Sequence, residues 1–522
     1  MSRRHKIPRT LCRPRRRGPR RPRLTFGHAP PLPRRPVRSG RPRRRPRRRP
    51  ARAGGRRGPP LVARRHPHPR RAPLTPLRRQ RKDPRVADAL GQRLAELIDT
   101  YEVPGAALAY LHNGELHEFA AGVLNVDTGV EATPDSLFQI GSITKVWTAT
   151  LLMQQVERGR LTLDTPVAEL LPGFRVADAE VSRTVTVRHL LSHTSGIDGD
   201  LFLDTGRGDD CVKKYVEACA GLAQNHPLGA TQSYCNSGFV IAGRILEVLE
   251  GRTWDAVLRE NICGPLGLTH TWTLPEDVLR FRAAHGHVED GRAAPVWGLM
   301  RSCGPAGLIC ARPRDVVAFG RAHLEGGLLD DPRAMWEPQV DIPNPHTLGR
   351  HWGIGWIIDE WSGRRVLSHG GNTIGQHAML WAVPDTGTVV CVTTNGGHSG
   401  AFTRALATEL FAELDGLTVP PVLGPPETPV QVDVERYAGV YERVGSRMTA
   451  GVHDGTLRLR IEATGPLAAL EEPFDLDLVA VDDVTFVGRR EGEPDWLSGV
   501  FYQLDDGSPY LHLGVRATPK IA

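Results

Sequence analysis

A serine and a lysine stand three positions apart in the stretch FQIGSITKVWTATLLMQQVERGRL, residues 138–161. The apolar residues that follow them predict a helix. Positions i and i+3 share one face of a helix, so Ser142 and Lys145 can hold a hydroxyl beside an amine. Unpaired N–H groups at a helix start also stabilise negative charge on the serine oxygen. The pair could therefore form an activated nucleophile; the alternative is a helix-capping serine and an exposed lysine.

A tyrosine and an asparagine stand two positions apart in TQSYCNSGFVIAGRILEVL, residues 231–249. They directly precede another apolar helical pattern, so Tyr234 and Asn236 can project from one turn into a common cleft. Side chains alternate along such a turn, so we expect Cys235 to face away as a buried thiol. The alternative is a loop tyrosine whose hydroxyl lies in water.

A histidine and two glycines end a predicted strand in VLSHGGNTIGQHAMLWAV, residues 366–383. Because glycine has no side chain, Gly370 and Gly371 let a substrate approach the backbone closely. The alternative is an ordinary turn.

The three motifs, S-x-x-K, Y-x-N and H-x-G, follow one another about 90 and 135 residues apart. This order resembles the penicillin-recognising serine hydrolases, a family of class C β-lactamases, D,D-peptidases, D-aminopeptidases and related esterases. Two further stretches, TVRHLLSHTSGI at residues 186–197 and GPAGLICARPRDVVAFG at residues 304–320, also resemble sequences of this family. The resemblance covers roughly residues 86–414.

The resemblance implies a role for each motif residue. Ser142 would be the acylated nucleophile, Lys145 its proton partner and Tyr234 an anionic general base. Asn236 would bind the carbonyl side of the substrate. His369 takes the place of the lysine or histidine that opens the third motif.

The same resemblance places the oxyanion hole at the backbone N–H groups of Ser142 and Asn372. A tyrosine with an ordinary pKa near 10 must lose about three units to act as a base at neutral pH, which needs about 4 kcal/mol of preferential stabilisation of its anion. Neighbouring cations would supply that stabilisation. Lys145 is the first candidate, and a protonated His369 is the second. No cofactor and no metal are implied.

Strand patterns at both ends of residues 83–416, with helical patterns between them, predict an α/β (α+β) fold. The resemblance implies a β-lactamase/transpeptidase-like antiparallel sheet flanked by helices, with a helical subdomain. Asn113-Gly114 predicts a tight hairpin near the start of this domain. Residues 417–429 form a proline-rich linker. Residues 430–522 alternate apolar and polar positions, which predicts a small β-barrel similar to the lipocalin-like appendage of some family members.

Residues 1–82 differ in composition from the rest of the chain. They hold 32 Lys and Arg, 17 Pro and no Asp or Glu, whereas the other residues carry a formal charge of −23. Charge repulsion, proline and a lack of apolar residues predict a disordered extension. A misplaced start in a GC-rich gene would produce such a stretch, and a basic arm that contacts nucleic acid or an anionic membrane is the alternative.

Composition also limits the compartment and the type of site. No run reaches the ~18 apolar residues that span a bilayer, and no signal-peptide core is visible. The eight cysteines lack C-x-x-C pairs, which favours reduced, mostly buried thiols and a cytoplasmic protein. The metal motif H-E-x-x-H and the α/β-hydrolase elbow G-x-S-x-G are absent from the sequence.

His369 is the departure that bears on the substrate. Penicillin-degrading members usually carry lysine there, a permanent cation that pairs with the drug's carboxylate, whereas an ordinary histidine is mostly neutral at pH 7. We therefore expect an esterase or a D-aminopeptidase-like enzyme for small esters, amides or peptides. A β-lactamase or D,D-peptidase is the alternative, and a catalytically silent module that binds peptides or penicillins is the alternative outside enzymology. We expect no nucleic-acid partner for the acidic body, and no membrane partner.

Overall fold

The computed structural model describes residues 78–79, 84–288, 290–428, 430–464, 472–490 and 495–522. The predicted disordered extension lies outside the described residues except at Arg78–Arg79, which form strand β1 and pair in parallel with β3. No helix in the described part of the chain is long and apolar enough to cross a membrane.

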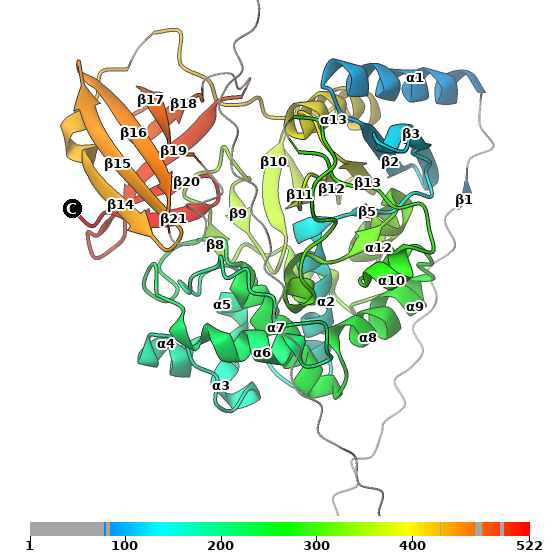
Figure 1. The fold of residues 1–522 in the computed structure, drawn as a ribbon, viewed down its shortest axis with the longest axis horizontal. Coiled ribbons are helices and arrows are strands. Elements are labelled where there is room, and N and C mark those ends of the chain that lie inside the picture. The colour runs from blue at the N-terminus through cyan, green and yellow to red at the C-terminus, as the bar shows by residue number, and fades with distance from the viewer. Residues whose placement is uncertain (1–77, 80–83, 289, 429, 465–471, 491–494) are drawn as a thin grey trace, which may run out of the picture. The chain divides into compact units, whose positions relative to one another are not determined.

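A mixed, mostly antiparallel sheet is the centre of the fold (Figure 1). The predicted hairpin is present, and both of its turn residues, Asn113 and Gly114, have the positive φ (50° and 77°) that this tight turn requires. In spatial order the strands are β1, β3 (Glu115–Asn125), β2 (Gly105–His112), β13 (Thr388–Thr394), β12 (His377–Val383), β11 (Arg364–Asn372), β10 (Ile357–Trp361), β9 (His351–Trp352) and β8 (Val340–Asp341), and β4 (Val130–Glu131) pairs with β3.

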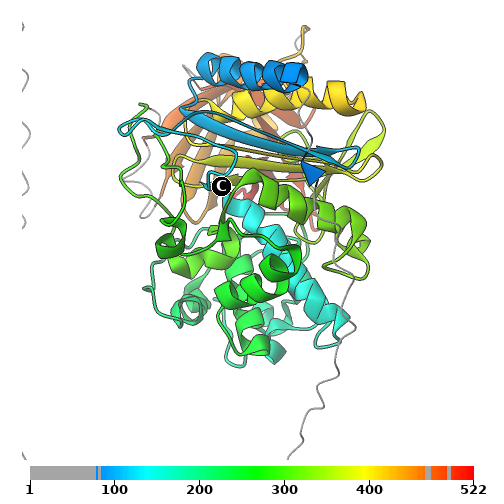
Figure 2. The ribbon, with the colours of Figure 1, turned by 90° about the vertical axis from the view of Figure 1, so that its right-hand side faces the viewer.

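Helices cover both faces of this sheet (Figures 1 and 2). Helices α1 (Pro84–Thr100) and α13 (Ser399–Asp415) cover one face, and α2 (Thr144–Glu157) and α12 (Pro313–Glu325) cover the other. Successive residues of β2 therefore enter different cores: Leu108 packs with α1 and α13, and Ala109 packs with α2. The predicted antiparallel sheet flanked by helices is confirmed.

Short helices form the predicted helical subdomain beyond α2. A second, three-stranded sheet consists of β5 (Phe138–Gln139), β7 (Cys310–Ala311) and β6 (Thr271–Trp272), in that spatial order. The α-helices are α3 (Val167–Leu170), α4 (Ala179–Thr184), α5 (Val187–Leu191), α6 (Cys211–Ala218), α7 (Asn236–Glu250), α8 (Trp254–Leu258), α9 (Gly264–Leu266), α10 (Pro275–Val278) and α11 (Gly304–Gly307). Along the whole described chain, short 3-10 helices are η1 (Gly141–Ile143), η2 (Cys219–Gly221), η4 (Arg301–Cys303), η5 (Pro332–Met335) and η6 (Val434–Tyr437), and η3 (Arg259–Cys263) is a π-helix.

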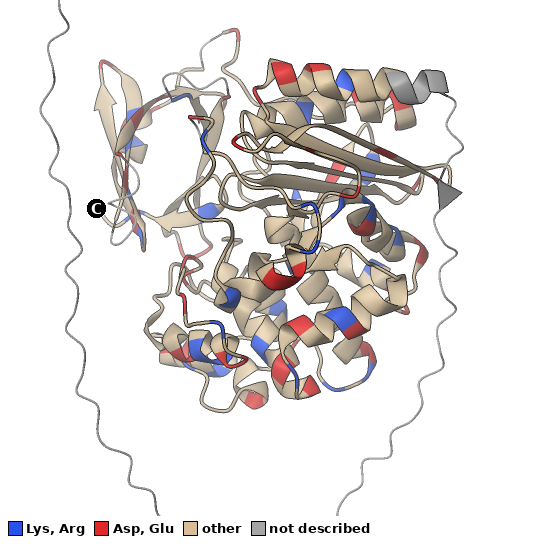
Figure 3. Cartoon of the chain, turned by 45° about the vertical axis from the view of Figure 1, so that its right-hand side comes forward, with Lys and Arg blue, Asp and Glu red and all other residues tan. Residues whose placement is uncertain are grey.

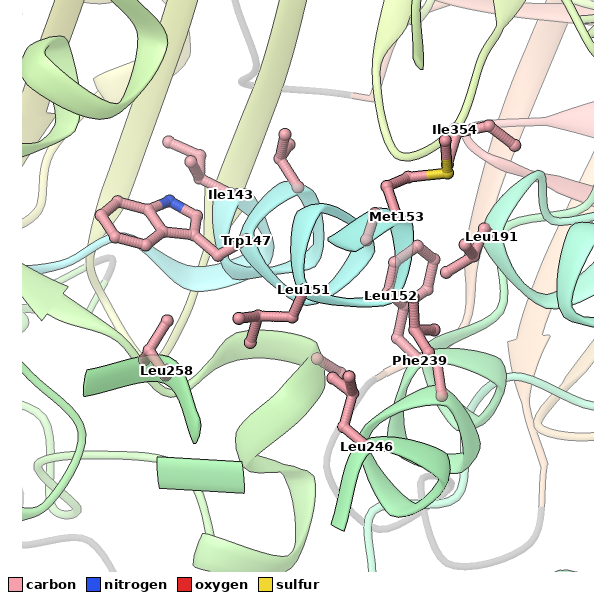
Figure 4. Close-up of a cluster of buried hydrophobic side chains, with 14 of the residues drawn as sticks. Ile143, Trp147, Leu151, Leu152, Met153, Leu191, Phe239, Leu246, Leu258 and Ile354 are labelled. Carbon is pink, nitrogen blue, oxygen red and sulfur yellow. The ribbon is translucent and has the colours of Figure 1, made fainter. Parts of the chain in front are cut away.

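Helix α2 is buried on all sides. Every residue from Thr144 to Gln155 is buried, and Trp147, Leu151 and Leu152 point outward in different directions into the surrounding core (Figure 4). Its polar side chains are hydrogen-bonded: Thr148 Oγ1 donates to Pro305 O at 2.7 Å. A helix enclosed in this way cannot rotate or slide, so the residues at its start are held rigidly.

The predicted C-terminal barrel is also present. Eight strands follow one another in sequence order: β14 (Gly439–Arg443), β15 (Ser446–His453), β16 (Thr456–Ala463), β17 (Phe474–Ala480), β18 (Thr485–Gly488), β19 (Leu497–Gln503), β20 (Pro509–Leu513) and β21 (Arg516–Pro519). The last residues return to the first strand, where Ile521 N donates to Val440 O at 2.7 Å. Side chains such as Leu457, Leu476 and Phe501 fill the interior. The barrel is therefore a nearly closed, packed body.

Charged residues of both signs are interspersed along the same helices and strands (Figure 3). Many of them form pairs, such as Lys214 with Asp210 at 2.8 Å and Arg458 with Asp477 at 2.6 Å. Exposed pairs of this kind contribute little to stability, about 0–1 kcal/mol each. Their main effect is to keep the surface well solvated.

Candidate active site

Ser142 and Lys145 meet at the start of α2. Lys145 Nζ lies 3.0 Å from Ser142 Oγ and donates to Ala306 O at 2.7 Å. The residue that caps α2 is Ile143, and no side chain caps the helix. Ser142 is therefore not a helix cap, and Lys145, which is completely buried, is not a solvated surface charge. Both features of the alternative interpretation are absent at this pair.

Burial changes the acid–base behaviour of Lys145. Removal from water holds the pKa of its amine well below the ordinary value, and the Arg516 guanidinium lowers that pKa further. Both effects favour the neutral amine. A neutral amine has a lone pair that can accept the proton of the Ser142 hydroxyl, which an ammonium group cannot do.

Tyr234 lies next to both Lys145 and Ser142. Lys145 Nζ is 4.8 Å from the centre of the tyrosine ring. Burial raises the pKa of the Tyr234 phenol, while the neighbouring Ser142 hydroxyl and the Arg516 guanidinium act in the opposite direction. The Tyr234 hydroxyl is buried, and no described residue gives it a hydrogen bond of normal geometry. The environment therefore favours the protonated phenol, in contrast to the anion that the family resemblance implied.

His193 forms hydrogen bonds with the two residues that flank Tyr234 in the chain. Ser233 N donates to the carbonyl oxygen of His193 at 2.9 Å, and Cys235 N donates to its Nδ1, also at 2.9 Å. The imidazole packs on the Tyr234 ring with 4.2 Å between ring centres. His193 has φ +59°, a conformation that non-glycine residues rarely adopt. It belongs to the stretch at residues 186–197, in which the sequence singled out no individual residue.

Arg516 reaches the site from strand β21 of the barrel. Its guanidinium carbon lies 5.1 Å from the centre of the Tyr234 ring. Two of its nitrogens donate to Asp200, at 2.6 and 3.2 Å, and Arg443 donates to the same carboxylate at 3.2 Å. Asp200 also accepts a hydrogen bond from the side chain of Asn236, and together these bonds hold its pKa low although burial raises it. One carboxylate thus fixes both the predicted asparagine and a barrel arginine.

The backbone of the barrel supports this contact. Tyr234 N donates to Val515 O at 3.0 Å, and Ala517 N donates to Ser233 Oγ at 3.2 Å. The barrel hairpin β20–β21 therefore packs directly against the segment that carries the second motif. No pattern in the sequence predicts this contact, because a single arginine in a β-pattern is indistinguishable from the other exposed charges of a barrel.

His369 lies at the end of β11, within the same cluster. Its ring centre is 6.3 Å from that of Tyr234 and 5.5 Å from that of Trp352. Burial lowers the pKa of the imidazole to about 3, and the nearby Lys145 acts in the same direction. The prediction that a protonated His369 supplies a second cation is therefore wrong. The cation beside Tyr234 is Arg516, because the buried Lys145 is held toward its neutral form.

The glycines after His369 lie against the turn that carries the nucleophile. A Cβ placed on Gly371 would be 1.9 Å from Ile140 O and 2.9 Å from Ser142 N, and one on Gly141 would be 2.8 Å from Asn372 N. Only glycine fits at these two positions. The close approach brings together the two backbone N–H groups, those of Ser142 and Asn372, that the resemblance assigns to an oxyanion hole. Gly370 is less constrained, because its nearest neighbour is the flexible Met379 side chain at 3.2 Å.

A hollow of about 1300 Å³ begins at Asn372 and extends past the tip of the β11–β12 hairpin. Thr373, His377 and the start of α13 at Ser399 are among its walls. Its walls include Asn372 but none of Ser142, Lys145 and Tyr234.

In the described part of the chain, no three His, Cys, Asp or Glu residues are placed to hold a metal ion. Seven cysteines are free and buried (Cys211, Cys219, Cys235, Cys263, Cys303, Cys310 and Cys391), and Cys12 lies outside the described residues. Cys235 Sγ accepts from Gly238 N at 3.2 Å at the start of α7, so it has a structural contact away from the Ser142 hydroxyl.

Comparison with known proteins connects this geometry to a family. A family model described as Beta-lactamase matches residues 90–414. Penicillin-binding protein 4 of Amycolatopsis lactamdurans is 47% identical over 369 residues, which are 68% of this chain and 97% of that protein.

Two groups of solved structures are similar as well. The crystal structure of SurE superposes with a TM-score of 0.69 at 27% identity, over 84% of this chain and all of that one, and a second crystal structure is of SurE with D-Leu. A D-stereospecific amidohydrolase from Streptomyces sp. superposes with a TM-score of 0.51 at 28% identity, over 63% of this chain and 98% of that one. The first of these similarities extends over the barrel as well as the sheet.

Proposed function

Since the chain belongs to the beta-lactamase family, we propose that it is a serine hydrolase that forms an acyl-enzyme on Ser142 and cleaves small amides or peptides, with esters as further substrates. The observation that carries this proposal is the 3.0 Å contact between the Ser142 hydroxyl and the buried Lys145 amine. A nucleophile beside its proton acceptor is the geometry that acyl transfer needs.

In the proposed acylation step, Lys145 is the base. Its neutral amine takes the proton from Ser142 as the hydroxyl oxygen attacks the substrate carbonyl. The negative oxygen of the tetrahedral intermediate lies between the N–H groups of Ser142 and Asn372, which would contribute about 10²–10³ in rate per donor. The C–N or C–O bond then breaks as the leaving group takes a proton.

Tyr234 is the proposed donor of that proton. Its phenol is protonated at neutral pH, whereas Lys145 is driven toward the neutral form, and two groups whose pKa values are moved apart in this way can act as acid and base. After donation, the Arg516 guanidinium stabilises the phenolate, and the protonated Lys145 returns a proton to it. In deacylation a water molecule attacks the acyl-enzyme, and the same proton transfers in reverse release the acid and restore the Ser142 hydroxyl.

The similar proteins support D-configured amides or peptides as the substrate class. A structure of SurE is described with D-Leu, and the Streptomyces enzyme is named a D-stereospecific amidohydrolase. A β-lactamase or D,D-peptidase activity is the second candidate. It is favoured by the 47% identical penicillin-binding protein and by Arg516, a permanent cation 5.1 Å from the centre of the Tyr234 ring.

A turnover panel tests these proposals. D-amino acid p-nitroanilides, p-nitrophenyl esters and a chromogenic cephalosporin are compared with the wild-type protein and with Ser142→Ala. We expect hydrolysis of the anilides and esters, and its complete loss in the variant. Hydrolysis that persists in Ser142→Ala would contradict the nucleophile, whereas covalent labelling of Ser142 without turnover would identify a silent binding module instead.

A further inference from the structure

We propose that His369 recognises a hydrogen-bond donor of the substrate: the buried Nε2 lone pair accepts the N–H of the scissile amide. This inference rests on the proposed acyl-enzyme function and specifies its substrate class. It predicts secondary amides that bear an N–H, in preference to N-alkylated amides.

The tautomer of His369 follows from one contact. Nδ1 lies 2.6 Å from the carbonyl oxygen of Gly370. A carbonyl oxygen can only accept a hydrogen bond, so Nδ1 must carry the proton. A neutral imidazole has one N–H, and Nε2 therefore presents a lone pair.

That lone pair has no partner within the described residues. Nε2 is buried, the whole residue is 2% exposed, and no described group donates to it. Buried polar atoms are almost always hydrogen-bonded, and the exceptions gather where a ligand completes them. The Tyr234 hydroxyl and His193 Nε2, which belong to the same aromatic cluster, are also buried without a hydrogen bond of normal geometry to a described group.

His193 provides the contrast inside the same cluster. Its Nδ1 accepts from Cys235 N, so its proton resides on Nε2. Two buried imidazoles beside Tyr234 therefore hold opposite tautomers. The tautomer of His369 is set by the backbone of β11 at the strand end, and it places an acceptor where a lysine would place a donor.

Because the third motif opens with this histidine and not with lysine, it accepts a hydrogen bond where a lysine would donate one. A lysine ammonium has three donors and no acceptor, so it pairs with a carboxylate. A fixed acceptor instead repels a carboxylate and binds N–H. When it holds the amide N–H, it also orients the nitrogen so that the lone pair developing in the tetrahedral intermediate can face the Tyr234 hydroxyl, which is the proposed proton donor.

Three substrates with one acyl group test the inference. D-leucine p-nitroanilide has the N–H, D-leucine N-methyl-p-nitroanilide lacks it, and D-leucine p-nitrophenyl ester has no amide nitrogen. We measure kcat/KM for the wild-type protein, His369→Gln and His369→Phe. Glutamine keeps an acceptor oxygen near the position of Nε2, whereas phenylalanine keeps the ring and removes the acceptor.

We expect His369→Phe to lose about 3- to 10-fold on the anilide, the usual effect of one neutral hydrogen bond. The loss on the ester and on the N-methyl anilide should be less than about 2-fold, and His369→Gln should recover most of the anilide rate. An equal loss on all three substrates, or no loss on the anilide, would overturn the inference. Thermal unfolding of each variant shows whether it is folded.

A binding experiment separates this inference from the proposed function. Calorimetry measures the Kd of D-leucine anilide and of its N-methyl derivative with Ser142→Ala and with the double variant Ser142→Ala/His369→Phe. We expect preference for the N–H ligand in the first protein and equal affinities in the second. Equal affinities in both would reject the inference even where turnover is observed, and a preference removed by His369→Phe would support it even where turnover is not.

Discussion

Two regions build the site in different ways: the start of α2 and the hairpin β20–β21 of the barrel. Ser142 and Lys145 are three residues apart, and one turn of a rigid helix brings them together. Arg516 reaches Tyr234 only because a separate, packed body docks against the second motif. The reacting pair is therefore a local property of the chain, whereas the cation that supports it is a property of the tertiary structure.

The local region carries the largest expected effect. Lys145→Ala removes the proposed base, and loss of a positioned general base costs about 10²–10⁴ in rate. We expect kcat/KM on the anilide to fall by about that factor while far-UV circular dichroism stays unchanged. Activity retained within 10-fold would mean that the base is not Lys145 and that the start of α2 does not supply the reacting pair by itself.

The next variant, Gly371→Ala, tests the close approach between the turn that carries Ser142 and strand β11. Gly371→Ala places a methyl group 1.9 Å from Ile140 O, so backbone must move. We expect a loss of about 1–3 kcal/mol in the free energy of unfolding and at least a tenfold loss of kcat/KM. Gly221→Ala is the matched control, because no atom lies within 4 Å of the added methyl group. Equal behaviour of the two variants would contradict the proposed oxyanion geometry.

Arg516→Gln tests the barrel region by its pH dependence. The proposed base works as the neutral amine, so kcat/KM should rise with pH through the pKa of Lys145. Arg516 lowers that pKa, and it also lowers the pKa of Tyr234. Its removal should therefore move both the acid and the alkaline limbs of the profile to higher pH and reduce the maximum by about tenfold.

Arg447→Gln is the control for this variant. Arg447 also belongs to the barrel, but its side chain is half exposed and pairs with Glu442. Both residues are far from Arg516 in the sequence. Its pH profile should match that of the wild-type protein. If both variants shift the limbs alike, the effect reflects the net charge of the barrel and not the docked guanidinium.

The smallest expected effect concerns His193, which packs on the Tyr234 ring and binds the backbone beside it. His193→Asn tolerates the positive φ and offers an oxygen to Cys235 N, but it removes the ring stacked on the tyrosine. We expect about a 2- to 5-fold loss of kcat/KM and a greater loss for His193→Ala, which lacks the acceptor as well. A shifted alkaline limb in the pH profile would identify the ring as a positioning group, whereas a lower melting temperature with an unchanged profile would assign it a purely structural role.

Much of the architecture could be predicted from the sequence because it follows from local patterns. Apolar spacing identified α7, and Asn113-Gly114 identified the first hairpin. The helical pattern after Ser142 was also correct, but it did not reveal that α2 is buried on all sides, because burial depends on which elements surround a helix.

The candidate site was predictable to the extent that its residues fall in short motifs. The structure brings Ser142, Lys145, Tyr234 and His369 into one cluster. The ionisation of these groups was not predictable, because burial sets it and a sequence does not show burial. This is why His369 is neutral where a cation was expected. Arg516 and Asp200 were missed for a related reason: their roles depend on docking between distant segments.

The barrel contact also has a consequence for how the protein acquires its activity. Contacts between segments far apart in the chain are generally made late, because a long loop must close before they form. In a refolding experiment the barrel, whose strands pair with their neighbours in sequence, should regain its circular dichroism signal before the central sheet, in which β2 pairs with the distant β13. Hydrolysis should recover in a slower phase, at the moment when Val515 and Arg516 reach Tyr234.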